Sequence, residues 1–556
     1  MTSSTASDAF AAAAQRRPRL MLVLLCLALF LPGFFSLPSG DRDESRFAQA
    51  TRQMLDSGDP VRLRVGEEER NKKPVGIHWA QAATVHLVEA TGLGSRRDIW
   101  AYRIPSLLGA ILAVLFTFTL GRRLVGPRPA LLAATMLAGT MVLMVEAHIA
   151  KTDAALLAAV TAAMGLMGAA YLQPAGFSAR QAALFWIALG IGVLLKGPIA
   201  PMVALLAGIT LAVVDRGSVP WLRALRPLWG VPLMLLLVLP WMAAIGIATE
   251  GRFFAEAVGD DMLGKVGSGD EKHWGPPGFY LLTFPIAAFP AGILALLAAR
   301  GVWAERALPR TRFLLAWIVP SWLVFEAVAT KLPHYTLPTY PAVMLLAAAW
   351  AMDPLRLAPP RWLALLARVL VAGIALGLSV VALLVPWLAT AHEPVGAFLS
   401  VPFAILLVVL TWRAMAASRW ARAAVLGVLA AIPLYASVME FTLPRVEPIW
   451  IAPRLQAALE RVAPGLPASR FGITSHAEPS TLFRIGAETR FLRRGEDAAR
   501  FLAEAPGRAV AVGNRALDDF RRESAALGIA PREREAVHGF NYTRGRALTL
   551  HLFTLD

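Results

Sequence analysis

The sequence has a single cysteine, Cys26, which excludes both a disulfide framework and a cysteine metal cluster within the chain. Acidic residues are also scarce, with 38 Asp and Glu against 54 Lys and Arg and a net charge of +16. In a soluble protein this excess would indicate a nucleic-acid partner. Because 57% of the residues are hydrophobic, arginine-rich cytoplasmic loops of a membrane protein explain it better, and no nucleic-acid partner is expected.

Long apolar stretches account for most of the chain. A bilayer span needs roughly 17–25 apolar residues. Thirteen candidate stretches lie near residues 18–37, 101–121, 129–147, 153–172, 181–195, 198–214, 228–249, 278–299, 312–329, 336–352, 364–388, 396–412 and 421–439. We therefore expect a polytopic α-helical membrane protein with about 13 transmembrane helices. The sequence shows no convincing internal repeat and no low-complexity segment.

The distribution of arginine predicts the orientation. If the N-terminus is cytoplasmic, every predicted inner loop carries arginine, from Arg122 to Arg422, whereas the short outer loops hold almost nothing basic except Lys151, Lys196 and Lys331. This pattern predicts a multi-pass protein of the bacterial inner membrane with a periplasmic C-terminus. The first apolar run is long for a signal peptide and lacks a clear cleavage site, so we interpret it as a retained first helix.

Two predicted outer segments are long, and the first, residues 38–100, contains a candidate amphipathic helix over 43–58. An apolar stripe recurs there at i, i+3, i+7 and i+8: Phe47, Ala50, Met54 and Leu55. Asp41 and Glu44 are spaced as in a capping box. We expect this juxtamembrane helix to lie in the membrane interface.

Composition changes after about residue 440. Short β-type runs near 470–474, 489–492, 509–512 and 547–554 predict strands, and 496–505 and 517–527 predict helices. The chain therefore divides into a membrane domain, 1–440, and a small periplasmic α/β domain, 441–556.

Ionisable residues gather on the predicted outer side, and at membrane depth such residues are functional candidates. They are Asp41, Asp43, Glu44, Arg46, Lys72, Lys73, Glu146, His148, Lys151, Asp153, Lys196, Asp260, Asp261, Lys265, Glu271, Lys272, His273, Lys331, His334 and Tyr335. Acids and lysines at one mouth indicate an anionic ligand and a proton acceptor. Structural roles compete for several: Glu44 as a capping partner, Arg46 at lipid headgroups, His148 as a satisfied histidine and Lys196 at a helix end.

A series of short motifs resembles one family in collinear order. The segments are Gly40–Ala48 (GDRDESRFA), Asn71–Trp79 (NKKPVGIHW), Arg103–Ser106 (RIPS), Lys151–Asp153 (KTD), Lys196–Pro198 (KGP) and Lys331–Pro338 (KLPHYTLP). Each is weak alone, but the set resembles the ArnT-type glycosyltransferases of family 39, which belong to the GT-C superfamily with the protein O-mannosyltransferases.

The resemblance implies a GT-C fold and a transferase that takes a sugar from a polyprenyl-phosphate donor. The implied acceptor is lipid A or another envelope glycan or lipid at the periplasmic face. Membrane lipids are expected partners, and the chain is expected to be a monomer. The implied catalytic residues are Asp43 and Asp153. The implied donor-phosphate and substrate-binding residues are Arg46, Lys73, Lys265, Lys331 and Tyr335.

One position departs from the family. Aminoarabinose transferases carry a Glu before the Lys-Pro, and this Glu helps to hold a metal with a histidine. Here that position is Lys72, and a protonated lysine cannot ligate a metal. We therefore expect no metal and no cofactor, and the departure also weakens aminoarabinose as the expected sugar.

The chemistry fits these residues independently of the resemblance. Lys73, helped by Lys265 or Lys331, could hold a phosphate leaving group. Asp43 could take the proton of an acceptor hydroxyl, and direct displacement would invert the anomeric carbon without a carboxylate nucleophile. The alternatives are a lipid or sugar transporter or flippase, which would favour repeats and mid-membrane polar residues, and a structural subunit of an envelope assembly.

Overall fold

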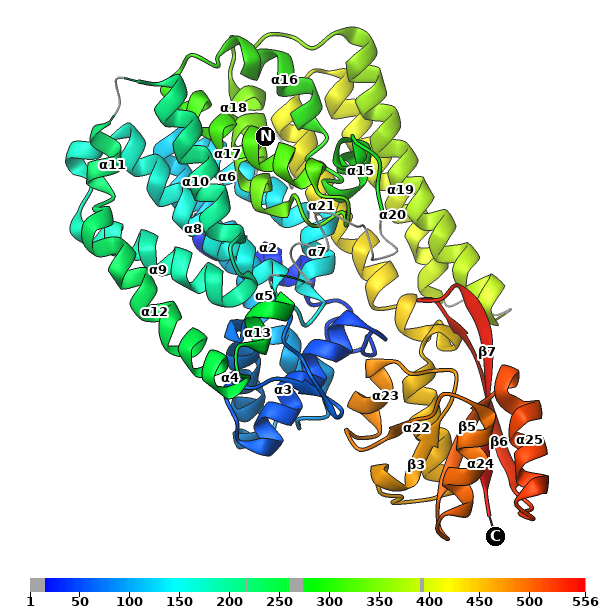
Figure 1. Cartoon of the computed structure of the whole chain (residues 1–556). Coiled ribbons are helices and arrows are strands. Elements are labelled where there is room, and N and C mark those ends of the chain that lie inside the picture. Colours follow the sequence, from blue (N-terminus) through cyan, green and yellow to red (C-terminus); the bar gives the residue numbers. More distant parts are fainter. Residues whose placement is uncertain (1–15, 217–218, 258, 260–273, 391–394, 556) are drawn as a thin grey trace.

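The computed structural model describes residues 16–216, 219–257, 259, 274–390 and 395–555. Its larger part is a body of helices, and its smaller part is a C-terminal α/β domain (Figure 1). The helices that match the predicted spans are α2 (Pro18–Phe30), α5 (Ile99–Val125), α6 (Pro127–Gly139), α7 (Met141–Ala147), α8 (Asp153–Leu172), α9 (Ala179–Lys196), α10 (Ile199–Val214), α12 (Pro227–Ala248), α15 (Phe279–Ala287), α16 (Leu294–Ala304), α17 (Pro309–Ala327), α18 (Tyr340–Met352), α19 (Arg361–Thr390), α20 (Val395–Ala416) and α21 (Trp420–Met439).

All thirteen predicted stretches are helical, but two of them are broken. The third is α6 and α7, which meet at a bend of 63°, and the eighth is α15 and α16. Among the described residues, seven helices are long and apolar enough to cross a membrane, or eight if the bent pair counts as one span. Four further apolar helices are shorter, namely Pro18–Phe30, Ile199–Val214, Leu294–Ala304 and Leu337–Met352.

Two helices of the first long loop and one short helix of the second lie at one end of the helical body. They are α3 (Asp43–Ser57), α4 (Gly76–Ala90) and α13 (Arg252–Phe254), and a small hairpin of β1 (Arg64–Val65) and β2 (Glu68–Glu69) lies between α3 and α4 in the chain. Figure 1 shows α3 and α4 at the end that faces the C-terminal domain, whereas α16 and α11 (Pro220–Ala224) lie at the opposite end. We call the first of these ends the α3 end.

The helix predicted over residues 43–58 is confirmed as α3, while its place at the membrane surface stays a prediction. Its Phe47, Ala50 and Met54 are buried, as the apolar stripe requires, and Gly58 ends it in a left-handed conformation with φ of 68°. The polar residues Ser45, Gln49 and Thr51 of α3 are buried as well. The helix is therefore packed on most of its circumference, more deeply than an amphipathic helix that rests on a bilayer surface.

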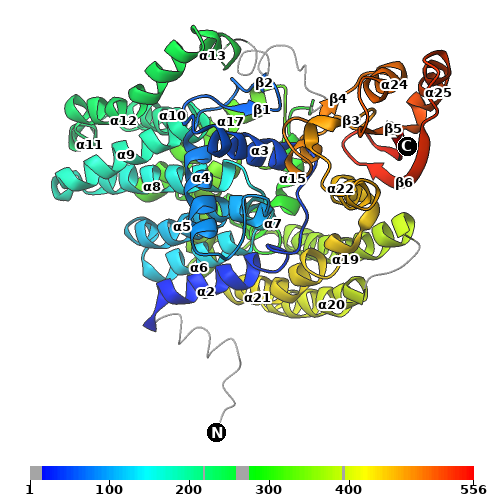
Figure 2. The same cartoon turned by 90° about the horizontal axis from the view of Figure 1, so that it is seen from below.

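The C-terminal domain is a five-stranded sheet covered by helices. The strand order is β4 (Arg490–Phe491), β3 (Phe471–Ile473), β5 (Ala509–Gly513), β7 (Arg546–Thr554) and β6 (Arg532–Asn541). The first two pairings are parallel, and the last two are antiparallel. Its helices are α22 (Ile451–Val462), α23 (Pro479–Arg484), α24 (Gly495–Ala503) and α25 (Leu517–Ala526). Figures 1 and 2 show this domain beside α3, where α23 contacts it.

Candidate functional site

Asp43 opens helix α3, and its carboxylate is the most accessible acid of the motif that contains it. The side chain is 60% exposed, and its Oδ1 lies 3.2 Å from Nη1 of Arg46, one turn further along the helix. An ion pair this exposed is weak, so either partner can exchange it for a ligand with little loss. Asp43 is thus placed where a substrate could reach it.

The predicted capping box is wrong, because neither Asp41 nor Glu44 caps α3. The N-cap position is Arg42, and no side chain caps the helix. Glu44 turns inward instead, and its two oxygens accept from Nε and Nη2 of Arg103 on α5 at 2.7 and 3.0 Å. Both side chains are buried, and a bidentate Arg–carboxylate pair in that environment outweighs a local cap.

Arg103 and Glu44 connect two of the sequence motifs and reach the residue just before a third. Arg103 also donates to the carbonyl oxygens of Phe34, Leu37 and Pro38, which close the end of the first span. Glu44 accepts from the backbone N–H of Gly40 and of Ala150. The Arg103–Glu44 pair therefore fixes α3 to α5 and to the loop that precedes α8.

Ser106 holds that loop from the other side. Its hydroxyl lies 2.7 Å from the carbonyl oxygen of Ile149 and 3.0 Å from that of Lys151. The Arg-Ile-Pro-Ser motif therefore holds two segments together. Its arginine anchors the start of α3, and its serine anchors the Lys-Thr-Asp loop. This arrangement brings two segments that are more than a hundred residues apart to one place.

A compact charged cluster lies at this place, and Asp153 is its centre. The Asp153 carboxylate lies 2.5 Å from Nζ of Lys196, 3.6 Å from Nζ of Lys151 and 3.8 Å from Nε2 of His334. Glu146 lies on the far side of Lys151, with its Oε1 3.0 Å from the ammonium and 3.5 Å from Nδ1 of His334. We call these five residues the charged cluster.

The electrostatics of the charged cluster keep the Lys151 ammonium charged and the His334 imidazole neutral. Burial alone would lower the pKa of Lys151, but the carboxylates of Glu146, Asp153 and Asp43 hold that pKa above its ordinary value. Burial lowers the pKa of His334 to about 3, so the imidazole is neutral at neutral pH. The contribution of Asp43 to the pKa of Lys151 links α3 to the cluster.

The structure brings Tyr335 to the charged cluster and places the ammonium of Lys331 against backbone carbonyl oxygens. Nζ of Lys196 lies 5.2 Å from the centroid of the Tyr335 ring, in a cation–π contact. Lys331 is buried, and its ammonium donates to the carbonyl oxygens of Gly275 and Val328. Lys73 is half-buried just before α4, and Lys265 lies outside the described residues.

The turn that carries Lys73 is held against α3 by aromatic and polar packing. The ring of His78 on α4 stacks on Phe47 at 5.3 Å, and its Nδ1 lies 2.7 Å from the hydroxyl of Thr51. The guanidinium of Arg70 also lies over the Phe47 ring, 4.5 Å from its centroid. These contacts fix the orientation of α4 relative to α3, and thus of Lys73 relative to Asp43.

The described residues contain no group of three or more His, Cys, Asp or Glu side chains that could hold a metal ion. Lys72, at the position of the family's metal-binding Glu, is exposed and cannot ligate while protonated. Within the described residues the donor set does not fit the metal site of the aminoarabinose transferases, and because Asp260, Asp261 and His273 lie outside those residues, the absence of a metal stays a prediction.

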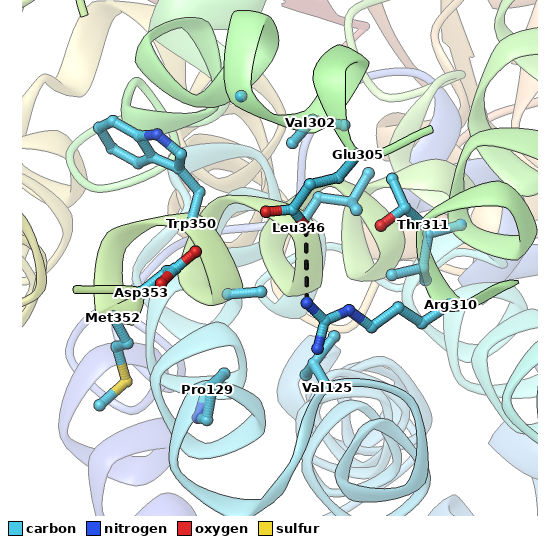
Figure 3. A pocket seen from close by; sticks show the side chains of 13 residues that line it. Val125, Pro129, Val302, Glu305, Arg310, Thr311, Leu346, Trp350, Met352 and Asp353 are labelled. Atoms are coloured by element: carbon cyan, nitrogen blue, oxygen red, sulfur yellow. Dashed lines mark hydrogen bonds and ion pairs between the residues drawn. The ribbon is translucent and has the colours of Figure 1, made fainter. Parts of the chain in front are cut away.

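A cavity of about 260 Å³ lies away from the charged cluster, between α16, α17, α18 and the α5–α6 turn (Figure 3). Its lining includes Glu305, Arg310 and Asp353, and Arg310 lies 3.5 Å from Glu305. These residues belong to the end of the helical body opposite the α3 end. None of the predicted site residues lines this cavity, so we place the candidate site at the α3 end.

Sequence reasoning counted Glu146, Lys151, Lys196 and His334 among the ionisable candidates but gave none of them a catalytic or binding role, although all four belong to the charged cluster. Three of them could have been assigned to the site from the motifs, because Lys151 and Lys196 begin two of the quoted motifs and His334 lies inside a third. Glu146 had no motif, and only the turn after α7 brings its carboxylate to Lys151.

Comparisons with known proteins agree with the motif series. The family model of dolichyl-phosphate-mannose-protein mannosyltransferase matches residues 42–251. The undecaprenyl phosphate-alpha-4-amino-4-deoxy-L-arabinose arabinosyl transferase of Pseudomonas paraeruginosa is 29% identical over 426 residues, which cover 73% of this chain and 72% of that protein. Its counterpart from Pectobacterium atrosepticum is 28% identical over 314 residues, which cover 55% of this chain and only 54% of that relative.

Solved structures establish the fold. The crystal structure of ArnT from Cupriavidus metallidurans bound to undecaprenyl phosphate aligns with a TM-score of 0.72 at 18% identity, covering 96% of this chain and 97% of that chain. The apo form of the same protein gives a TM-score of 0.69 at 18% identity, covering 97% and 98%. The resemblance to ArnT-type glycosyltransferases and the GT-C fold are confirmed, and the chain is a multi-pass membrane protein.

Proposed function

We propose that this ArnT-type membrane glycosyltransferase moves a sugar from a polyprenyl-phosphate donor to lipid A, or to another envelope glycan or lipid, at the periplasmic face of the inner membrane. The observation that carries the proposal is the arrangement at the α3 end, where an accessible carboxylate, Asp43, lies beside a buried cluster of lysines and acids. A transferase that uses a lipid-linked phosphate sugar needs both features at one place.

Asp43 is the proposed general base. An acceptor hydroxyl gives its proton to the Asp43 carboxylate while its oxygen attacks the anomeric carbon. The bond between that carbon and the phosphate oxygen breaks, and the polyprenyl phosphate leaves with the electron pair. One displacement inverts the anomeric carbon, so no carboxylate nucleophile and no covalent sugar–enzyme intermediate is needed.

Lys73 is the proposed partner of the donor phosphate, with Arg46, Lys265 and Lys331 assisting. Arg46 pairs with Asp43 across 3.2 Å in the structure. If the guanidinium turns to an arriving phosphate, it neutralises the leaving group and at the same time frees the Asp43 carboxylate to act as a base. Donor binding would in this way activate the base only when the leaving group is in place.

Asp153 is proposed to act through the lysines that it holds. Its carboxylate is buried against Lys196 and Lys151, and such a partner keeps an ammonium group charged at a fixed position. The Tyr335 ring contacts the Lys196 ammonium in a cation–π interaction. We propose that the cluster presents positive charge to the developing negative charge on the phosphate, without being consumed by the reaction.

The test is reconstitution of transfer. Purified protein in nanodiscs would receive undecaprenyl-phosphate-linked sugars, one at a time, together with lipid A, and products would be weighed by mass spectrometry. The proposal predicts an acceptor heavier by one sugar residue and released undecaprenyl phosphate. Movement of the donor across the bilayer with no glycosylated product for any sugar or envelope acceptor would favour a flippase and contradict the proposal.

A further inference from the structure

The C-terminal domain holds the residue that lies two positions before Asp43. The backbone N–H of Asp41 donates to the phenol oxygen of Tyr542 at 2.7 Å, and its carbonyl oxygen accepts from the backbone N–H of Ser480 at 3.1 Å. Its carboxylate Oδ1 accepts from the Ser480 hydroxyl at 2.9 Å. Both backbone polar groups of Asp41 are thus satisfied by the C-terminal domain.

Further contacts between the C-terminal domain and the helical body lie along α3. Glu478, only 2% exposed, lies 3.5 Å from Nε of Arg42. Further along α3, Nη1 of Arg52 donates to the carbonyl oxygen of Phe483 at 2.8 Å. The Phe483 ring is fully buried against Tyr102 of α5, so an aromatic side chain of α23 is inserted into the helical body.

Among the described residues, the start of α3 is held by side chains of the helix itself only at Gly40, whose backbone groups pair with Glu44 and Ser45. No side chain caps the helix, and the N-cap residue Arg42 is exposed with φ of −105° and ψ of −90°. Glu44 fixes the side of α3 that faces the core, but Asp43 is 60% exposed and pairs only with Arg46 of its own helix among the ion pairs of the described residues. The path of residues 41 and 42 therefore decides where the Asp43 carboxylate points.

We propose that the C-terminal α/β domain positions the catalytic base, with Asp41, Ser480 and Tyr542 as its positioning residues. This inference rests on the proposed function, because it gives the domain a role only if Asp43 takes part in transfer. The domain acts on the reaction through the backbone of Asp41. The C-terminal domain is therefore a component of the active site, and the membrane domain without it would not position Asp43 for transfer.

The test is a full-length variant that removes both side-chain contacts to Asp41, Ser480→Ala with Tyr542→Phe. Thr549→Val is the matched control, because it removes a hydroxyl from the exposed His538–Thr549 contact of the same domain, away from α3. A small displacement of a reacting group can reduce rates by about a hundredfold. We expect kcat to fall by about tenfold or more, with the KM for the lipid-linked donor within about twofold of the control.

A purely structural role of these contacts would instead lower the amount of folded protein and leave kcat per folded molecule unchanged. A kcat of the double variant within about twofold of Thr549→Val would overturn the inference. If the double variant does not fold, Tyr542→Phe alone carries the test, since it removes one oxygen from an exposed ring: a kcat about threefold below the control supports the inference, and an equal kcat overturns it.

Asp43→Asn in the same assay separates the two claims. An inactive Asp43→Asn beside a fully active double variant would overturn only the positioning role of the C-terminal domain. A fully active Asp43→Asn would overturn the proposed function itself.

Discussion

Asp43 and Glu44 are adjacent acids with opposite fates, and the difference is set by their partners. Glu44 is buried in a bidentate pair with Arg103, whereas Asp43 is exposed beside Arg46. From the sequence alone, the local spacing of Asp41 and Glu44 favoured a capping box, because the true partner, Arg103, lies 59 residues away. The choice of Asp43 as the free acid nevertheless agrees with its exposure.

Lys73 should bear the donor phosphate. Lys73→Ala is expected to reduce transfer by about tenfold or more, because the phosphate of the bound donor loses the positive charge that neutralises it. Lys73→Arg should keep part of the activity, since guanidinium also binds phosphate. Steady-state transfer with purified protein measures both, and Lys72→Ala is the control, because Lys72 is the exposed neighbour. A stronger loss in Lys72→Ala than in Lys73→Ala would contradict this assignment.

Arg103 should matter to the fold more than to the chemistry. Arg103→Met leaves the buried Glu44 carboxylate without its charge partner and removes one donor from each of three carbonyl oxygens, which should cost about 3–5 kcal/mol of stability. The exposed pair of Arg62 and Asp59 provides the control, because Arg62→Met should change stability by less than about 1 kcal/mol. Thermal unfolding in detergent compares the two, and equal melting temperatures would show that the buried pair does not anchor α3.

At the scale of elements, periodicity located the helices but not their breaks. The stripe of Phe47, Ala50 and Met54 predicted α3 almost to its ends, because burial on a helix recurs at fixed spacing. The predicted span 278–299 is instead α15 and α16. Continuous apolar sequence hides such a break, and Pro290 and Gly292 between the two helices were its only local sign.

In the C-terminal domain, apolar strands were predicted and a charged one was missed. Strands β3, β4, β5 and β7 fall on the predicted runs, but β6 was not recognised. The first half of β6 reads Arg-Glu-Arg-Glu and is exposed at the edge of the sheet, where charged residues are common and leave no alternating apolar pattern. Helix α23, which contacts α3, was also missed because it is only six residues long.

The contact of α23 with α3 should depend on pH through Asp41. Burial, opposed by the Ser480 hydrogen bond and reinforced by Glu478, raises the pKa of Asp41 from 3.8 to about 6, with Arg42 acting in the opposite direction. The folded state therefore binds this proton more tightly than the unfolded state. Stability should fall by about 3 kcal/mol as pH rises from about 4 to about 6 and stay level above that.

Thermal unfolding of the full chain between pH 4.5 and 7 measures this effect. Asp41→Asn should flatten the profile over that range, because Asn cannot titrate and its amide oxygen can still accept from Ser480. The difference between the two profiles removes the contribution of every other group. Identical slopes for the two proteins would show that Asp41 is ionised at the interface throughout.

At the scale of the whole molecule, the sequence predicted a membrane body and a C-terminal domain, and the motif series predicted the GT-C fold. What it could not predict is how the two parts meet. The contacts of Asp41 with Ser480 and Tyr542 join residues more than 400 positions apart, and no local pattern marks them. The predicted 13 membrane spans and the periplasmic placement of residues 441–556 remain predictions.

Reporter fusions test this topology. The arginine alternation predicts cytoplasmic signals for fusions after Arg128 and Arg226, and periplasmic signals for fusions after Ala391 and Asp556. The structure is compatible with this arrangement, because the loops that follow α5 and α16 lie at the end opposite the C-terminal domain (Figure 1). A cytoplasmic signal at Asp556 would exclude the 13-span topology.

The turnover of Asp43→Asn tests the central claim most directly. The variant keeps the shape of the side chain but removes the base, so it should insert normally, bind the polyprenyl-phosphate donor and lose transfer by about two or more orders of magnitude. Asp41→Asn, assayed in parallel, should lose less than about threefold, because its amide oxygen can still accept from Ser480. Near-normal turnover of Asp43→Asn beside an inactive Asp41→Asn would contradict the proposal and assign the base to the other acid.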